Sequence, residues 1–555
     1  MSRSPVATNT ASALPAIDTN PTQFANAAAE WRRALGREAV DIEQDALEQY
    51  ASNETATARK VLAVIRPASA REVSELVRIA GKHRIPLYPV SRGHNWGYGA
   101  ASPVTDDCVV VDLSRMNAIV AFDEDLGVVT VQPGVTPRQL RDYLDARGAP
   151  YLVPVHGAGP DCSLIGNALE RGYGVTPYVD HFGAVTSLEA VLPDGSIYHP
   201  ALSSLGGETA DQVFKWGIGP YLDGLFSQGN FGIVTEMTVA LAPIPETTEG
   251  FLFTLKRDAD LEEAVMAVQD ILKRIGNISG SINLMNDRRV LSMAEAYPMG
   301  SVPVGEVMPE ALVNDLSRKN YVGPWTVGGI LYGDKRLVSA AKALIGKRTK
   351  AVARRHLFFS RTRIDLLRRL LALVPDRLTR TLKQQIANVD EAFKVAEGAP
   401  SETALSLCYW KSGRRPASGR PMNPATDGCG IIWYSPLIPM KPDLVRRYVD
   451  TVKSICIKHR MEPLITLTSL SHRCFDSTVP LLFDREDPDE TRRAKACYRA
   501  LFETGRQQGF VPYRVGIDHM HLITQAGTTY WDLVSKIKRV IDPDSIIAPG
   551  RYCLR

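Results

Sequence analysis

Several residue types that could do chemistry lie together in the segment SRGHNWGYGA at residues 91–100. The apolar run IPLYPV precedes it, so we expect a strand that leads into a glycine-containing turn. Backbone N–H groups in such a turn can converge on an anion, and Gly93, Gly97 and Gly99 remove side chains that would block its approach. The segment lacks a GxGxxG spacing that opens a helix, so a nicotinamide Rossmann site is not favoured.

The elements around this loop are expected to form a βαβ-like unit. VLAVI and IPLYPV predict strands, and ASAREVSELVRIAG between them predicts a helix with Ser69 as its N-cap. Further strands follow the loop, with a helix opened by Thr136 and Pro137 and closed by Gly148. A hairpin is expected around Asp194 and Gly195.

A length of 555 residues suits two domains. We expect a flexible leader at 1–26 and a strand-rich domain at 27–246 that ends in prolines. Residues 247–505 alternate strands with long helices, which predicts an α+β domain with a mostly antiparallel sheet. A tail at 506–555 follows.

Composition excludes some partners. With 65 basic and 61 acidic residues the net charge is only +4, too balanced for a nucleic-acid footprint. Because no run is long enough for a membrane span and the first residues lack a continuous apolar core, we expect neither a membrane span nor a signal peptide. The leucine- and arginine-rich stretch 361–383 predicts an amphipathic helix with a solvated face, with membrane-surface contact as the alternative.

The eight cysteines are scattered without metal-type or disulfide-type spacing. This pattern favours reduced thiols, a cytoplasmic location and no metal site.

Long segments of the chain carry a family resemblance. They include PLYPVSRGHNWGYGAASPV, IGNALERGYGVTPYVDHFGAVTSLEAVLPDGSIY, FKWGIGPYLDGLFSQGNFGIVTEMTVALAPIPE and GCGIIWYSPLIP. They resemble the vanillyl-alcohol oxidase family, in its 4-phenol-oxidising branch, and occur in that family's order. The resemblance implies an α+β fold: a PCMH-type FAD-binding domain built from both chain ends, and an inserted α+β cap whose antiparallel sheet is flanked by helices.

The resemblance also implies which residues hold FAD. The pyrophosphate would lie on residues 91–99, namely Ser91, Arg92, Gly93, His94, Asn95, Trp96, Gly97 and Gly99. Residues implied to line the same cofactor are Ser163, Gly166, Asn167, Gly172 and Gly174. Those implied on its adenine–ribose side are Gly229, Asn230, Gly232 and Ile233.

The implied substrate is a small aromatic compound, a 4-substituted phenol bound as phenolate by Tyr98, Tyr513 and Arg514. A phenol with a pKa of about 10 ionises at neutral pH only if a fixed positive charge and hydroxyl donors stabilise the anion. Hydride would then leave the benzylic carbon and produce a quinone methide. Arg551, in APGRY, matches an arginine near the flavin pyrimidine, where positive charge stabilises the reduced flavin.

The chain departs from the family where relatives carry an aspartate as base or flavin-tuning group. Asp161 in HGAGPDCSLIGN takes that role only with a shifted alignment, since the ungapped position is Ala158. Val175 replaces a tyrosine, although Tyr178 is retained. His156 and His181 are further polar candidates.

The flavin attachment is also expected to differ. The cap segment PMNPATDGCGII has neither the histidine nor the tyrosine that tethers flavin in the phenol oxidisers, and Cys429 is its only nucleophile. His94 matches a loop histidine that other branches use, so we expect covalent attachment through His94, with Cys429 as the alternative.

Two other functions stay open. The same fold could oxidise a non-phenolic alcohol or amine, with Tyr98 and Tyr513 as ordinary hydrogen-bond donors. A flavin-binding protein without turnover is the third hypothesis. Electrons would pass to oxygen or to an acceptor protein, and family analogy implies a homodimer.

Overall fold

The strand–helix–strand unit before the glycine loop forms as predicted. In the computed structural model, which describes residues 20–417 and 419–554, the Ser69 hydroxyl accepts the N–H of Glu72 at 3.2 Å and caps the helix. The sheet has the order β1-β2-β4-β3, with β2, β4 and β3 parallel and β1 antiparallel. Its elements are β1 (Val40–Asp41), β2 (Val61–Ile65), α3 (Ala70–His83), β3 (Leu87–Val90) and β4 (Cys108–Asp112).

A second sheet of five antiparallel strands follows. Its order is β5 (Ile119–Asp123), β6 (Val128–Val131), β10 (Ile233–Ala240), β8 (Val185–Val191) and β9 (Ile197–Tyr198). The predicted helix is α4 (Pro137–Arg147), which Thr136 caps and Gly148 ends at a φ of 65°. Strands β8 and β9 form the hairpin expected around Asp194 and Gly195.

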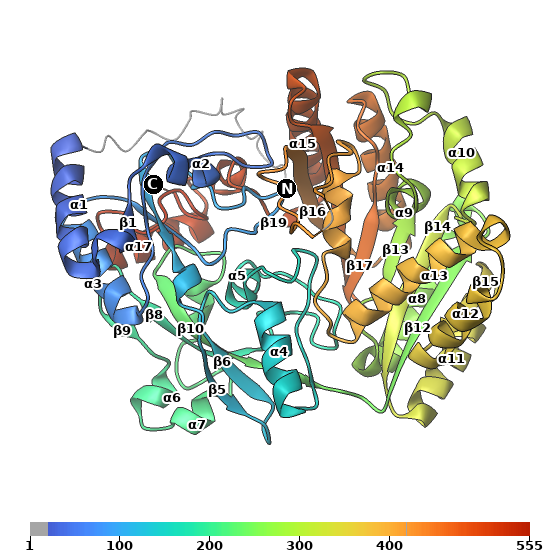
Figure 1. Cartoon of the computed structure of the whole chain (residues 1–555), viewed down its shortest axis with the longest axis horizontal. Coiled ribbons are helices and arrows are strands. Elements are labelled where there is room, and N and C mark those ends of the chain that lie inside the picture. Colours follow the sequence, from blue (N-terminus) through green and yellow to red (C-terminus); the bar gives the residue numbers. More distant parts are fainter. Residues whose placement is uncertain (1–19, 418, 555) are drawn as a thin grey trace, which may run out of the picture.

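The largest sheet has eight antiparallel strands, and it establishes the α+β class. Its order is β15 (Ala353–Phe359), β12 (Thr247–Leu255), β14 (Trp325–Gly333), β13 (Asn283–Asn286), β17 (Thr466–Ser471), β18 (Cys474–Asp484), β16 (Cys429–Pro439) and β19 (Pro512–Arg514). Long helices cover one face, as Figure 1 shows: α8 (Leu261–Ile275), α11 (Lys335–Thr349), α14 (Pro442–Lys458) and α15 (Pro488–Gln508). We call this sheet with its helices the cap.

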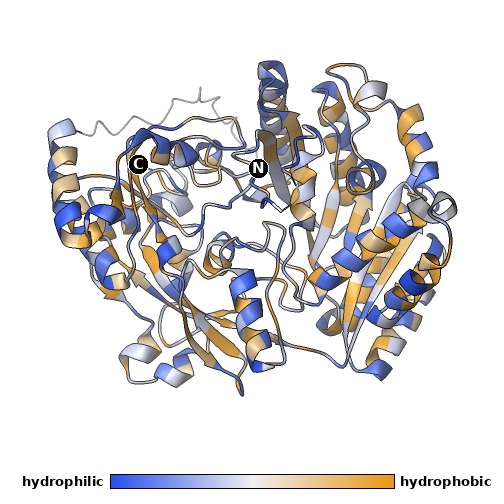
Figure 2. Ribbon diagram, viewed as in Figure 1, coloured by the Kyte–Doolittle hydropathy of each residue, from blue (hydrophilic) through white to orange (hydrophobic). Residues whose placement is uncertain are grey.

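The two faces of the cap sheet have different environments. Tyr434, Leu467 and Val479 pack into the apolar core under the helices. Their neighbours Ser435 and Thr468 point to the opposite face, because successive side chains alternate along a strand. Figure 2 shows that the strands are largely apolar and that the outer helices carry many hydrophilic residues.

The C-terminal tail lies in the core of the first sheet. Leu87 donates its N–H to the Ile546 carbonyl at 2.8 Å, and Ala548 donates to the Leu87 carbonyl at 2.7 Å. The buried Lys538 of α17 (Thr529–Ile541) donates to the Asn230 carbonyl and to Asp542. Residues at both ends of the chain therefore share one core.

The basic segment forms α12 (Arg361–Ala372) and α13 (Asp376–Ala396). Its leucines are more exposed than an amphipathic surface helix would suggest: Ile364 is buried, whereas Leu366, Leu370 and Leu373 are more than half exposed. Ion pairs from Arg361 and Arg368 to Asp390 join the two helices instead. In the described part of the chain, no helix combines the length and apolarity that a bilayer crossing requires.

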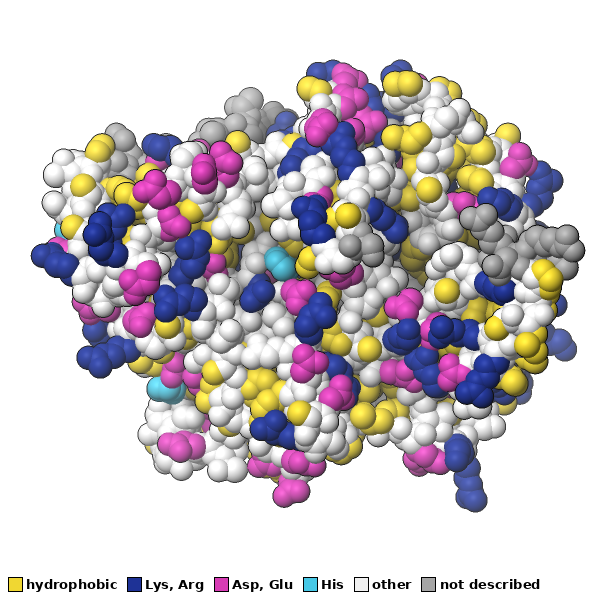
Figure 3. All heavy atoms as spheres, in the orientation of Figure 1, with side chains coloured by type: hydrophobic (Ala, Val, Ile, Leu, Met, Phe, Trp, Pro, Cys, Tyr) yellow, Lys and Arg dark blue, Asp and Glu magenta, His cyan; other side chains and the backbone are white. Residues whose placement is uncertain are grey.

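Basic and acidic side chains are interspersed over the face seen in Figure 3. All eight cysteines are free thiols.

Candidate active site

Tyr98 lies at the contact between the glycine loop and the cap sheet. Its hydroxyl is 2.8 Å from the hydroxyl of Ser435, and the Arg514 guanidinium lies 4.2 Å from the centre of its ring. Burial raises the pKa of Tyr98 to about 12, although Arg514 acts to lower it. Tyr98 is therefore a neutral hydrogen-bond donor beside a fixed positive charge.

Tyr513 belongs to the same cluster. It precedes Arg514 in β19, and its ring meets that of Tyr173 edge to face at a centroid distance of 5.4 Å. Burial raises the pKa of Tyr513 well above its usual value, and the charge of Asp476 adds to the effect. The structure thus brings Arg514 against the ring of Tyr98 and places Tyr513 within electrostatic reach of both.

One carboxylate, Glu170, binds both arginines of the site. Its oxygens accept from Arg551 and lie 3.3 Å from Nε of Arg514. Burial acts to raise the pKa of Glu170, but Arg551 and Arg514 outweigh it and hold that pKa below the usual value. Glu170 is thus an ionised anchor, and two cations against one anion leave the cluster positively charged.

Asp476 faces the cluster from the cap, and sequence reasoning missed it. Asp476 lies opposite Leu437 in the β16–β18 ladder. Leu437 is two residues beyond Ser435, so the side chains of Asp476 and Ser435 lie on the same face of the sheet. Burial raises the pKa of Asp476 to about 8, opposed only by Arg514. Its Oδ1 has no hydrogen-bond partner, nor does Oγ1 of Thr466. The one sequence signal was a charge in the middle of the strand CFDSTVPLLFD.

The glycine loop presents a narrower anion cradle than expected. Glu54 occupies two of its amides, because the N–H groups of Gly97 and Gly99 donate to Glu54 Oε1 at 2.5 and 3.2 Å. A Cβ at Gly97 would lie 2.1 Å from the Trp433 ring, so the close packing of the loop against the cap requires glycine at this position. Within the residues described, the N–H groups of 92–96 meet no acceptor. The amides of the loop that are left for an anion are therefore those of residues 92–96.

A second loop packs against the first and adds a helix N-terminus beside its free amides. Arg92 donates to the Asp161 carbonyl at 3.0 Å, and Trp96 Nε1 to the Ala158 carbonyl at 3.2 Å. Ser163 caps α5 (Leu164–Leu169) by accepting the N–H of Gly166. A Cβ added at Gly166 would lie 3.4 Å from Ser91 Oγ, so this helix begins close to the glycine loop. Free amides and a helix N-terminus suit a pyrophosphate.

Other expected cofactor glycines are explained by contacts inside the protein. A Cβ at Gly172 would clash with Asn167, one at Gly174 with His181, and those at Gly229 and Gly232 with backbone oxygens. Asn167 Nδ2 donates to His181 Nδ1 at 2.6 Å. Ile233 is a buried residue that begins β10.

Asp161 does not join the catalytic cluster. Its two oxygens accept from Arg138 at 2.9 and 3.0 Å, and its side chain is one-third exposed. The hydrogen bond from Arg138 holds the pKa of Asp161 below its usual value. The expectation that Asp161 acts as base is therefore corrected, because a carboxylate bound in a bidentate ion pair is a weak proton acceptor.

His94 and Cys429, the two candidate attachment points for the flavin, lie in different surroundings. His94 stacks on Trp96 at a centroid distance of 4.8 Å, and burial with Arg92 lowers its pKa to about 4, so the imidazole is neutral. Cys429 is fully buried, and burial raises its thiol pKa to about 11. A thiol–imidazole pair not considered from the sequence lies nearby, with Cys162 Sγ 3.2 Å from His156 Nε2.

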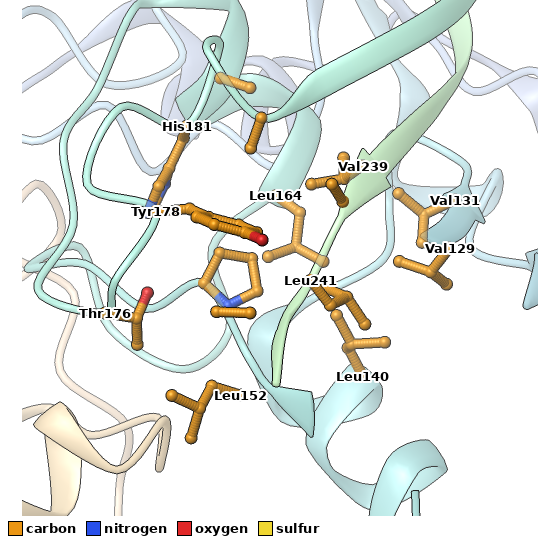
Figure 4. A pocket seen from close by; sticks show the side chains of 15 residues that line it. Val129, Val131, Leu140, Leu152, Leu164, Thr176, Tyr178, His181, Val239 and Leu241 are labelled. Atoms are coloured by element: carbon orange, nitrogen blue, oxygen red, sulfur yellow. The ribbon is translucent and has the colours of Figure 1, made fainter. Parts of the chain in front are cut away.

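A small apolar pocket lies apart from this cluster (Figure 4). Tyr178 and His181 border it together with aliphatic residues of β6, β10 and α4, including Val131, Leu140 and Val239. Neither Tyr98 nor any lysine or arginine lines it, so it lacks a fixed positive charge for binding an anion.

The comparisons with known proteins agree with this architecture. Residues 61–200 match the family described as "FAD binding domain". The chain is 36% identical over 542 residues to 1'-carboxy-chondrochloren decarboxylase of Chondromyces crocatus, covering 97% of this chain and 98% of that protein. The chain belongs to the vanillyl-alcohol oxidase family. It is an FAD-dependent oxidoreductase with the PCMH-type fold.

Other relatives extend over the full chain. The flavoprotein subunit of 4-cresol dehydrogenase (hydroxylating) from Pseudomonas putida is 27% identical, covering 95% of both chains. The structure of p-cresol methylhydroxylase with substrate bound gives a TM-score of 0.85 at 25% identity, covering 97% of this chain and 98% of that chain. 4-Ethylphenol oxidase from Gulosibacter chungangensis gives a TM-score of 0.86 at 22% identity over the same shares, which shows the fold.

Proposed function

We propose that this enzyme oxidises a 4-substituted phenol at its benzylic carbon, with the phenol bound as phenolate. The observation that carries the proposal is the convergence of Tyr98, Tyr513 and Arg514 in one buried cluster. Two neutral hydroxyl donors and a guanidinium are the groups that stabilise a phenolate oxygen. The family members that act on cresol and ethylphenol support this substrate class.

Each part of the site would have a separate role in this reaction. Residues 92–96 and the start of α5 would hold the FAD pyrophosphate, and Arg551 would lie near the flavin ring. When bound, FAD supplies the hydride acceptor. Arg514, anchored by Glu170, would fix the phenolate and thereby raise electron density at the para position. Asp476 would take up the phenol proton, since a carboxyl pKa of about 8 approaches that of the substrate.

A second candidate reaction is oxidative decarboxylation, which the similarity to the chondrochloren decarboxylase favours. If the carbon next to the benzylic position carried a carboxylate, loss of benzylic hydride would give a quinone methide acid. The bond to the carboxyl carbon would then break, and its electron pair would form the side-chain double bond and restore the phenolate. Carbon dioxide is the co-product, and the two electrons leave as the hydride.

We also propose that FAD is attached through His94. A neutral, half-buried imidazole in the loop has a free lone pair for this bond, whereas the Cys429 thiol is protonated below pH 11 and packed in an apolar cluster. Denatured wild-type protein should remain yellow after filtration, and His94→Ala should release its FAD. Release of FAD by Cys429→Ser or Cys162→Ser, but not by His94→Ala, would assign the link to that thiol.

Whether oxygen or an acceptor protein takes the electrons is left to experiment. Peroxide formed at the rate of substrate loss would identify an oxidase, and turnover only with an added electron acceptor would identify a dehydrogenase. A homodimer and a cytoplasmic location stay predictions.

The proposed reaction is tested by anaerobic mixing of the holoenzyme with substrate pairs. 4-Ethylphenol should bleach the flavin band, and 4-ethylanisole, in which the phenol is methylated, should not. Bleaching by benzylic alcohols or amines without a phenol, and by no phenol, would establish the non-phenolic alternative. With 3-(4-hydroxyphenyl)propanoate, 4-vinylphenol as product would select decarboxylation, and 4-hydroxycinnamate would select simple dehydrogenation.

A further inference from the structure

Arg289, on α9 (Asp287–Ala294) of the cap, is a partly buried cation without a carboxylate partner. Its Nε is buried and has no hydrogen-bond partner, and Nη1 donates only to the Ser292 hydroxyl at 3.2 Å. Among the residues that the structure describes, no carboxylate lies within ion-pair distance of it. Burial lowers the pKa of Arg289 to about 10, so the side chain is still charged at neutral pH. A desolvated charge without a counter-ion is costly, which points to a missing anionic partner.

The neighbouring residue shows how this fold treats a structural arginine. Arg288 is buried, and it binds Glu462 at 2.7 Å and Glu310 at 2.6 Å. Arg514 and Arg551 share Glu170 in the same manner. Arg289 differs from all three, so packing alone does not account for its burial.

The cap sheet places Arg289 on the same side as the active site. Ile431, four residues before Ser435 in β16 and therefore on the same face, packs in one apolar cluster with Leu291 of α9. Cys408 of that cluster lies within electrostatic reach of both Arg289 and Glu54, the residue that binds the glycine loop. Arg289 therefore lies on the side of the cap sheet that faces the glycine loop.

The strand register gives the approximate separation. Asp476 lies opposite Thr468, and Thr468 lies opposite Asn283, so these residues form one row across the sheet. Strand β13 runs from Asn283 to Asn286, and α9 begins directly after it. Asn283 lies two strands away from Asp476, about 10 Å across the sheet, and three residues along β13 span about another 10 Å, so Arg289 lies beyond the phenol end rather than at it.

We propose that Arg289 binds a carboxylate at the far end of the side chain of an extended 4-substituted phenol. The inference rests on the proposed phenol oxidation and adds a second anchoring point to it. A guanidinium offers paired N–H donors that match the two oxygens of a carboxylate. The apolar residues around it strengthen that attraction, because little water screens the charges.

The test is calorimetric binding to the dithionite-reduced holoenzyme, which cannot oxidise the ligands, of 4-hydroxyphenylalkanoic acids of rising chain length, each paired with its primary amide. Once the chain reaches Arg289, the acid should bind about tenfold or more tightly than the amide, as expected for hydrogen bonds between charged groups. Arg289→Gln should abolish this preference and leave binding of uncharged 4-ethylphenol unchanged. The control Arg369→Gln removes an exposed arginine of α12 and should have no effect.

Equal affinity of acid and amide at every length in the wild type would overturn the proposal, as would a preference that survives Arg289→Gln. If Arg289→Gln does not fold, Arg289→Lys keeps the charge without the paired donors and should reduce the preference. Phenylalkanoic acids without the 4-hydroxyl distinguish the proposed carboxylate site at Arg289 from the proposed phenol oxidation. If these acids bind through Arg289 while no phenol reduces the flavin, phenol oxidation is wrong and the anion site stands.

Discussion

The two walls of the active site treat their polar groups differently. On the wall next to the FAD-binding domain, Glu170 binds Arg551 of the C-terminal segment and Arg514 of β19, the edge strand of the cap sheet. On the wall that the inner cap strands β17 and β18 form, here called the cap wall, Asp476 and Thr466 each keep an oxygen without a partner. Paired charges hold a site in position, whereas buried unpaired groups are left for a ligand or a proton. The comparison suggests that one wall fixes the geometry and the other meets the changing part of the substrate.

Removing the shared anchor should have the largest effect. Glu170→Gln leaves two buried guanidinium groups facing each other, and we expect it to lower the free energy of unfolding by about 3–5 kcal/mol. Urea denaturation of the holoenzyme measures this loss. Glu310→Gln is the matched control, since Glu310 is a mostly exposed partner of Arg288 and should cost much less. Equal losses in the two variants would show that Glu170 is not an anchor.

Removing the positive charge from the anchored wall should be nearly as severe for catalysis. Arg514→Met should slow flavin reduction by phenols by about 100- to 1000-fold, as for loss of a group that stabilises a developing anion. Anaerobic stopped-flow absorbance measures the rate, with Arg369→Met as the exposed control. A rate within a few-fold of wild type would separate Arg514 from phenolate binding.

The cap wall is tested by Asp476→Asn. The variant should reduce flavin about 100-fold more slowly, the usual contribution of a positioned base. In the wild type the rate should rise as the pH passes about 8, where Asp476 ionises, and the variant should lack this rise. If the wild-type profile persists in Asp476→Asn, another group accepts the proton.

Part of this site could be predicted from sequence and part could not. Local patterns gave the βαβ unit and the glycine loop, and the family motifs gave Tyr98, Tyr513 and Arg514. Glu54 and Asp476 were missed because their roles depend on pairings between distant segments. Glu54 reaches amides more than forty residues away, and Asp476 acquires its burial only when β18 pairs with β16. Asp161 was misjudged because sequence did not reveal its ion pair with Arg138.

The smallest predicted effect concerns stability and pH. The pKa of Asp476 is raised in the folded protein, so its contribution is complete below the unfolded pKa near 4 and is lost as the pH rises through about 8. The melting temperature of wild type minus that of Asp476→Asn should therefore decrease by a few degrees between pH 5 and pH 9. A difference independent of pH would mean that Asp476 titrates normally.

The most direct test of the central claim is the ionisation state of a bound phenol. A 4-substituted phenol without a benzylic hydrogen, such as 4-chlorophenol, binds without reacting, and its ultraviolet difference spectrum distinguishes phenol from phenolate. At pH 8, where Asp476 is about half ionised and which is still below the solution pKa of the ligand, the wild-type complex should show the phenolate band and Arg514→Met should not. A neutral phenol spectrum in the wild-type complex would contradict the account.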